Sequence, residues 1–323
     1  MKKNNRKKLK FIKRSFLKNL ILVTGTHTSG KSMVSPVIAS LNNVEILRKI
    51  YLLDQIAILN SFSKIDNYIS TFISKHILDF SFYEQLIGRN LNFRYEDETG
   101  IYQSKNHKIF KKRIYIKRGK KVLEKHLKKN THMLVDTHDG MWFYDFWKRL
   151  NINNLKIISV FRNPIDVVNS WINLDLGKIE NEVLCQIPLI QKSGIKKPFY
   201  YFKSFEKKIN KYEAIIEMVS TCVNKDIDSY NSIKNKKYIY RVDFQDFAEN
   251  TNKNLKKICK FLNLNKSKYT FKILKKENLP RTVNKIEREN KLKKIKKKVK
   301  KIYLYKLLNL EKKYLKHKRL IEN

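Results

Sequence analysis

The chain has 323 residues, and it contains few glycines, prolines and cysteines. Its 8 Gly and 5 Pro exclude collagen-like and low-complexity scaffolds. Its three cysteines (Cys185, Cys222 and Cys259) are too scattered for a disulfide framework or a four-cysteine metal site, which favours a reducing compartment. The apolar run at 20–23 is far shorter than the roughly 20 residues of a membrane-spanning helix. No signal-peptide pattern follows the basic start. We therefore expect a cytoplasmic protein, with membrane-surface attachment left open.

Acidic residues are also scarce. The chain has 71 Lys and Arg against 29 Asp and Glu, a net charge of +42. Residues 1–18 hold nine basic residues and no acid, and residues 285–323 hold sixteen against four. Such a charge favours anionic partners: polyanionic glycans, nucleic acid, anionic lipid or a polyphosphate-like cofactor. Codon usage rich in A and T would also raise the lysine content, so the charge alone does not identify the partner.

The order of apolar segments predicts an α/β fold. We divide the chain into a basic tail (1–18), an α/β domain (19–284) and a basic helical extension (285–323). Short apolar strands are predicted at 19–24, 132–136, 156–161 and 237–242, and helices at 32–41, 141–150, 165–174 and 254–262. Strands that alternate with helices imply a parallel sheet with right-handed crossovers.

Three stretches are less regular. Residues 46–95 have a mostly helical pattern, and residues 104–130 are predicted as basic surface loops and helix. The chain from residue 286 is predicted as one long basic helix with an apolar stripe of Leu292, Ile295, Val299 and Ile302.

The strongest motif is Gly25-Thr26-His27-Thr28-Ser29-Gly30-Lys31-Ser32, which matches G-x-x-x-x-G-K-[ST] between a predicted strand and a predicted helix. Glycines let the backbone curl so that its N–H groups point at an anion. The helix N-terminus adds partial positive charge, Lys31 a full charge and Ser32 a hydroxyl. We predict that this segment holds a phosphate-type group, and we name it the phosphate loop.

A second motif starts at the end of the third predicted strand. Arg162 follows Val160-Phe161 and precedes Asn163-Pro164, and Ser170 comes eight residues after Arg162, in the next helix. Both belong at the carboxyl edge of the sheet, where open α/β folds bind ligands. A guanidinium and a hydroxyl aimed at one point suit a second phosphate.

Together the two motifs resemble the sulfotransferase family, whose members use 3′-phosphoadenosine 5′-phosphosulfate and have a fold related to P-loop kinases. Asp136-Thr137-His138 is similar to the segment that carries the catalytic His in cytosolic members, and residues 243–250 and 255–264 are similar to two further family segments. The resemblance covers residues 20–265. It implies a P-loop-type three-layer sandwich around a central parallel sheet, with a helical insertion after the first βα unit and the long basic C-terminal helix appended.

The resemblance also implies roles for individual residues. The phosphate loop would hold the 5′-phosphosulfate, and Arg162 and Ser170 would hold the 3′-phosphate. His138 would be the general base, and Glu45 is the rival, because related carbohydrate enzymes use a Glu that follows the loop helix. Two departures stand out: the loop cation is Lys31, after Gly30 instead of before Ser29, and Phe244 replaces the family's Tyr.

We therefore expect transfer of a sulfuryl group to a hydroxyl or amine of an acceptor, with Lys31 stabilising charge and with no metal, since the seven His show no ligand spacing. Basic stretches at 111–113 and 117–121 suggest an anionic glycan as acceptor. Nucleic acid is not an expected partner, and the basic tails leave peripheral membrane contact open. Two alternatives remain: an ATP-dependent P-loop kinase or NTPase, with 134–136 as its second strand motif, and a non-enzymatic polyanion-binding protein.

Overall fold

The computed structural model describes residues 15–103, 107–116, 119–176, 189–192, 195–198 and 209–322. Most of the predicted basic tail, up to residue 14, lies outside these residues. So do Cys185 and Lys117-Arg118.

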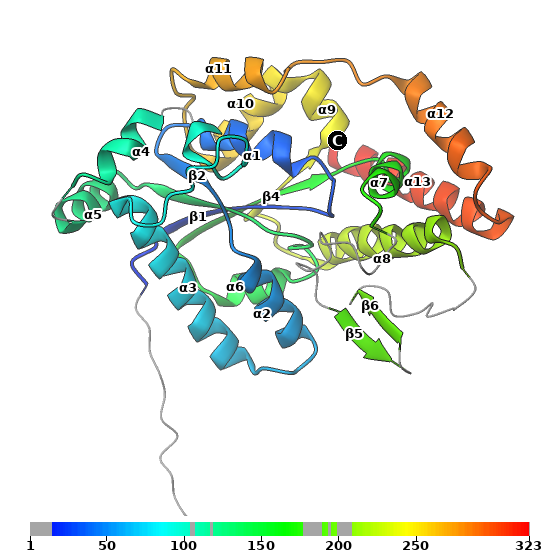
Figure 1. Ribbon diagram of the computed structural model, residues 1–323, viewed down its shortest axis with the longest axis horizontal. Helices are drawn as coiled ribbons and strands as arrows, with labels where there is room; N and C mark the ends of the chain where they lie inside the picture. Colours follow the sequence, from blue (N-terminus) through cyan, green and yellow to red (C-terminus); the bar gives the residue numbers. More distant parts are fainter. Residues whose placement is uncertain are drawn as a thin grey trace, which may run out of the picture.

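The core of the fold is a sheet of five parallel strands in the order β2-β3-β1-β4-β7 (Figure 1). The strands are β1 (Asn19–Thr24), β2 (Val44–Lys49), β3 (His132–Asp136), β4 (Asn154–Phe161) and β7 (Ile239–Asp243). The central strand β1 pairs with β3 and β4 and is buried on both faces, which is why residues 20–23 form a continuous apolar run. Because all five strands are parallel, their carboxyl ends meet at one edge.

Helices cover both faces of the sheet, as the three-layer prediction required (Figure 1). One face is covered by α1 (Lys31–Ala39), α9 (Phe244–Glu249), α10 (Thr251–Leu262) and α11 (Thr270–Lys276). The other is covered by α2 (Tyr51–Ser61), α3 (Asn67–Ile87), α6 (Tyr144–Arg149), α7 (Pro164–Asn173), α8 (Lys211–Ser232), α12 (Lys285–Lys296) and α13 (Lys301–Glu322). The remaining elements are η1 (Ile101–Gln103), α4 (His107–Arg113), α5 (Gly119–Lys128) and the antiparallel pair β5 (Leu189–Lys192) and β6 (Ile195–Pro198).

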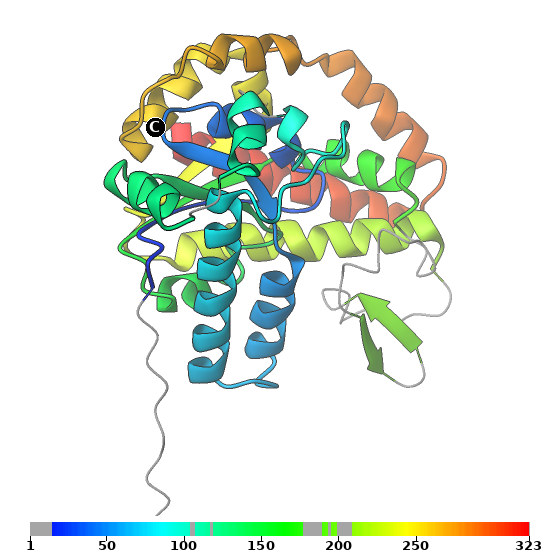
Figure 2. The same ribbon diagram turned by 60° about the vertical axis from the view of Figure 1, so that its left-hand side comes forward.

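The stretch predicted as mostly helical from residue 46 begins instead in a strand. β2 ends at Lys49, and α2 and α3 follow as a helical hairpin that extends from the body (Figure 2). β2 is an edge strand that pairs only with β3 in the sheet, and its sequence places Glu45, Arg48 and Lys49 beside Ile46 and Leu47. So short a segment, without strict alternation of apolar and polar residues, has no strand pattern that can be recognised from the sequence.

The C-terminal segment forms two helices, so the single helix predicted from residue 286 is wrong in that respect. The chain turns at residues 297–300, where Asn210 Nδ2 donates to the Lys298 carbonyl at 3.0 Å and Lys300 N donates to Glu213 Oε1 at 3.0 Å. Asn210 and Glu213 also form the capping box at the start of α8. The turn takes Ile302 out of the predicted apolar stripe, and its side chain is 71% exposed.

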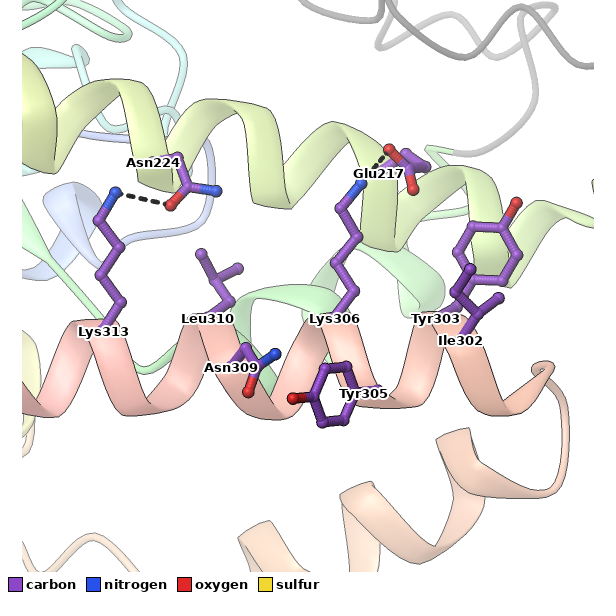
Figure 3. A pocket seen from close by; sticks show the side chains of 9 residues that line it. All are labelled: Glu217, Asn224, Ile302, Tyr303, Tyr305, Lys306, Asn309, Leu310 and Lys313. Atoms are coloured by element: carbon purple, nitrogen blue, oxygen red, sulfur yellow. Dashed lines mark hydrogen bonds and ion pairs between the residues drawn. The ribbon is translucent and has the colours of Figure 1, made fainter.

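The long basic C-terminal helix itself is present as α13, which lies along α8. Leu307 and Leu310 are buried in the core beneath it. On the surface, Lys306 Nζ contacts Glu217 Oε2 at 2.5 Å (Figure 3). α13 thus contributes to the core of the fold, while the division of the chain at residue 285 stays a prediction. Within the described residues, no helix is both long and apolar enough to span a membrane.

Candidate active site

The phosphate loop leaves β1 at the carboxyl edge of the sheet and enters α1. Gly30 has φ +99°, and a Cβ there would lie 2.0 Å from Cδ2 of Phe244, so this position requires glycine. Thr28 also has a positive φ, 62°. The amides of Met33 and Val34 donate to the Gly30 carbonyl, so the backbone donors at the open side of the loop are those of Lys31 and Ser32 at the start of α1.

Lys31 is the first residue of α1 and its side chain folds back over the loop. Its Nζ donates to the Gly25 carbonyl at 2.9 Å and lies 3.6 Å from Oδ1 of Asp136, at the end of β3. Both side chains are buried. The loop therefore holds a buried cation beside a carboxylate of the neighbouring strand.

The segment from the end of β4 into α7 donates two side-chain hydrogen bonds to carbonyls of the phosphate loop. Arg162 Nη1 donates to the Thr28 carbonyl at 3.1 Å, and Trp171 Nε1 donates to the His27 carbonyl at 3.0 Å. The guanidinium carbon of Arg162 lies 4.5 Å from the centre of the Phe244 ring. Burial lowers the pKa of Arg162 from its ordinary value, but a guanidinium remains charged in proteins. The structure thus places Arg162 in direct contact with the phosphate loop.

Ser170 comes from the same helix, and its hydroxyl donates to the Asp166 carbonyl, one turn earlier, at 2.9 Å. Asp166 in turn contacts Arg288 Nη2 at 2.9 Å and Lys291 Nζ at 3.1 Å. Arg288 and Arg281 both add to the positive potential at Arg162. The second part of the site is therefore cationic, and the cations of the C-terminal segment were not among the residues predicted for it.

His138 follows β3, at the same edge of the sheet. Its ring stacks on that of His27, with 5.2 Å between ring centres and 12° between planes. Burial lowers the pKa of each ring to about 3; for His27, the second cause is His138, and for His138 it is Lys31. Both imidazoles are consequently neutral at pH 7, so His138 can accept a proton.

Asp54 is a site residue that the sequence analysis missed. Its Oδ2 lies 3.6 Å from Nδ1 of His138, and its Oδ1 accepts a hydrogen bond from the Thr137 hydroxyl. Burial raises the pKa of Asp54 to about 7. It stands in the first turn of α2, 84 residues before His138, and no pattern in the sequence links the two.

The structure does not bring Glu45 to the phosphate loop. Glu45 is the second residue of β2, toward the amino end of a strand whose carboxyl end lies at the site. It forms a buried, two-contact ion pair with Arg113, at 2.7 and 2.9 Å. Glu45 does follow the loop helix α1 in the chain, as the sequence analysis expected. However, it lies near the amino end of β2, and the phosphate loop is at the carboxyl edge of the sheet.

The residues of the loop fit an anionic ligand. Thr28 Oγ1 and Ser29 Oγ are buried and have no hydrogen-bond partner among the described residues. Around them lie Lys31, Arg162 and the free amides of the helix start. In the part of the chain that the structure describes, no group of three His, Cys, Asp or Glu side chains is placed to hold a metal ion.

A family model identifies the family to which this chain belongs. The model of the sulfotransferase domain family matches residues 21–315, which is most of the chain. The protein belongs to the sulfotransferase family and is an enzyme of the sulfotransferase type. Comparison with curated protein sequences gives no significant match.

Solved structures with a similar fold include two sulfotransferases from bacteria. The sulfotransferase domain of the olefin synthase of Synechococcus PCC 7002 has 11% identity and a TM-score of 0.47, with 94% of this chain and 96% of that chain covered. A sulfotransferase from Mycobacterium tuberculosis H37Rv has 11% identity and a TM-score of 0.41, with coverage of 80% and 71%. The assignment to the family rests on the family model.

Proposed function

We propose that the protein transfers a sulfuryl group from 3′-phosphoadenosine 5′-phosphosulfate to a hydroxyl or amine of an acceptor. The observation that carries this proposal is that Arg162 contacts the Thr28 carbonyl, so a guanidinium for a second phosphate stands directly beside the phosphate loop. A donor with phosphate groups on both the 5′ and 3′ positions needs a second anion site beside the phosphate loop, whereas a nucleoside triphosphate needs only the loop.

The loop residues 25–32 would bind the 5′-phosphosulfate through backbone N–H groups, with Lys31 beside the bridging oxygen. Arg162 and Ser170 would bind the 3′-phosphate, which requires the Ser170 hydroxyl to turn from the Asp166 carbonyl. Positively charged groups around the leaving phosphate stabilise the charge that develops there, and this is the main source of catalysis in such transfers.

The reaction breaks the S–O bond to the phosphate oxygen and forms an S–O or S–N bond to the acceptor. The acceptor proton moves to a ring nitrogen of His138, and the electron pair of the broken bond stays on the phosphate. His138 is neutral at pH 7, as a general base must be before it takes up the proton. Asp54 would hold the ring in place and stabilise the imidazolium that forms.

We propose an anionic glycan as an acceptor class because of the high positive charge, and a cytoplasmic location because of the sparse cysteines. Both proposals are independent of the identity of the sulfuryl donor. Cys222 is buried as a free thiol, which is consistent with a reducing compartment.

The test is a transfer assay with donor labelled on sulfur, run against glycans, lipids and small hydroxyl compounds, beside a Mg²⁺-dependent ATP turnover assay. We expect labelled product with at least one acceptor and no ATP turnover. ATP hydrolysis or phosphoryl transfer without sulfuryl transfer would replace this proposal with the kinase or NTPase alternative, for which Lys31 and Asp136 would supply the parts.

A further inference from the structure

Residues 114–116, directly after α4, are three consecutive apolar residues with exposed side chains. Ile114, Tyr115 and Ile116 are 45%, 80% and 43% exposed. Single exposed apolar residues are common on soluble proteins, but a contiguous exposed group marks a surface that contacts something. The phosphate loop, His138 and Arg162 make no use of this turn.

The same segment is strongly basic. From His107 to Lys129 the sequence contains eleven Lys and Arg and one acidic residue, Glu124. Lys112 precedes the apolar turn, and Lys120 and Lys121 follow it on α5; all three are exposed. Arg113 is the exception to this exposure, because its ion pair with Glu45 is buried.

An apolar stripe on α3 leads toward this turn. Ile69, Ile73 and Phe80 are exposed on one face of α3, opposite the face that packs into the core. Ile87 lies on the same face of α3, seven residues after Phe80. The first residue of α5, Gly119, lies next to it: a Cβ at Gly119 would be 3.0 Å from Cγ2 of Ile87, so α5 begins at the end of the stripe. Figure 1 shows α4 and α5 beside this end of α3. A helix with apolar residues on two opposite faces is expected to be covered on both.

We propose that residues 112–116 with Lys120 and Lys121, together with the adjoining stripe of α3, dock the protein on a bilayer that contains anionic lipid. Tyr115 and the two isoleucines would enter the boundary between headgroups and acyl chains. Lys112, Lys120 and Lys121 would contact the headgroups, and clusters of lysine beside apolar residues bind anionic membranes in this way. A polyanionic glycan would pair with the lysines but leave Ile114 and Ile116 in water, so the lipid surface fits the turn better. This inference does not depend on the proposed donor, and it assigns Lys112, Lys120 and Lys121 to lipid headgroups, where the basic stretches by themselves suggested a glycan.

Sedimentation with vesicles tests it, with phosphatidylcholine vesicles that contain phosphatidylserine compared with phosphatidylcholine alone. The full-length protein is expected to bind the first and bind the second weakly. The triple variant Lys112→Gln, Lys120→Gln, Lys121→Gln should bind on the order of 100-fold more weakly, since each lysine near an anionic surface contributes about 1 kcal/mol. The triple variant Ile114→Ser, Tyr115→Ser, Ile116→Ser should lose at least about tenfold, because it removes the buried apolar area.

The matched control is Lys253→Gln, Lys256→Gln, Lys257→Gln on α10, which makes the same change in net charge at three exposed lysines elsewhere. It should bind like the unaltered protein, and thermal melts should show that every variant folds. In Tyr115→Trp, the added tryptophan emission should shift to the blue on vesicles. Equal loss in both lysine variants, or no loss in the serine variant and no blue shift, would overturn the proposal. A third outcome would indicate a glycan-binding surface instead. In that case heparin binding would require Lys112, Lys120 and Lys121 but not residues 114–116, and the serine variant would bind vesicles like the unaltered protein.

Discussion

Arg162 donates a hydrogen bond to the carbonyl oxygen of Thr28, so the residue proposed to bind the 3′-phosphate also supports the phosphate loop. Its guanidinium lies over the Phe244 ring, which in turn fills the space beside Gly30. The loop, the end of β4 and the start of α9 are thereby packed as one unit, and a change at Arg162 has two separable consequences.

The two consequences are distinguished by comparing two ligands by calorimetry. Arg162→Ala should weaken 3′-phosphoadenosine 5′-phosphate more than adenosine 5′-phosphate, because a charge-assisted hydrogen bond to the 3′-phosphate contributes roughly 1.5–3 kcal/mol. Trp171→Phe is the control: it removes the hydrogen bond to the His27 carbonyl and should weaken both ligands alike. If Arg162→Ala also weakens both ligands equally, Arg162 supports the loop and does not bind the phosphate.

Lys31 is the buried cation of the loop, and its removal should lower transfer. We expect Lys31→Ala to reduce turnover by about tenfold or more, within the range found when a charge-stabilising group is lost. Because Lys31 also faces the buried Asp136, the variant is first checked by thermal melting, and Lys31→Gln keeps a donor for the Gly25 carbonyl. Lys266→Ala serves as an exposed control. Normal turnover in a folded Lys31→Ala protein would contradict the role of the loop.

Substitutions of His138 and of Glu45 should change different properties, turnover for His138 and stability for Glu45. His138→Ala should lose about two to four orders of magnitude in turnover with donor affinity kept, because a base acts only in the transition state. Glu45→Gln should keep its activity per folded molecule but lower the melting temperature, because breaking a buried ion pair costs about 3–5 kcal/mol. Loss of activity in folded Glu45→Gln, with His138→Ala active, would reverse the assignment.

Asp54→Asn removes the negative charge beside His138 while preserving the shape of the side chain. We expect turnover to fall by about tenfold or more, which corresponds to about 1.4 kcal/mol of lost stabilisation of the imidazolium. Since the pKa of Asp54 is raised to about 7, kcat/KM of the unaltered enzyme should decline as Asp54 takes up a proton below that pH. The Asn variant should lack this step, and the exposed control Asp145→Asn should keep it. A step that persists in Asp54→Asn belongs to another group.

His317 should make the protein less stable at acidic pH. It is buried beside Arg241, and burial, followed by that guanidinium, lowers its pKa to about 3. Below pH 6.5 the unfolded chain protonates this residue and the folded protein does not, so stability falls as the pH falls from about 6.5 toward 3. Between pH 6.5 and 5 the loss is about 2 kcal/mol.

Urea unfolding at pH 7 and pH 5 measures this contribution. His317→Gln should lose about 2 kcal/mol less than the unaltered protein over this range. The buried carboxyls Asp54 and Asp139, whose raised pKa values act with the opposite sign, titrate in both proteins and cancel in the comparison. His76→Gln, at an exposed position on α3, should behave like the unaltered protein. Parallel pH dependence in His317→Gln would contradict the assignment.

Short-range patterns explain which elements were predictable. β1 is buried on both faces and appears in the sequence as a continuous apolar run, and the buried end of β4 (157–161) is apolar except for Ser159; the predicted bounds of both strands agree with the structure within two residues. The edge strand β2 has one neighbour and mixed polarity, so no local pattern marks it. The turn at residues 297–300 depends on Asn210 and Glu213, which are far away in the sequence, so one helix was expected where two exist.

The phosphate loop could be predicted from residues 25–32 alone, because a phosphate-binding loop needs glycines, a lysine and a hydroxyl within eight consecutive residues, and this pattern can be recognised without the rest of the chain. The spacing of Arg162 and Ser170 within one strand and one helix is also a local pattern, and it predicts that both lie at the carboxyl edge of the sheet. The carboxylate that faces His138, by contrast, follows from the packing of distant segments and from no local pattern. Asp54 reaches His138 because α2 starts beside the carboxyl edge of the sheet, while Glu45 stays with Arg113 at the other end of β2. Contacts between segments distant in sequence depend on strand direction and packing, and neither is encoded in any local pattern of residues.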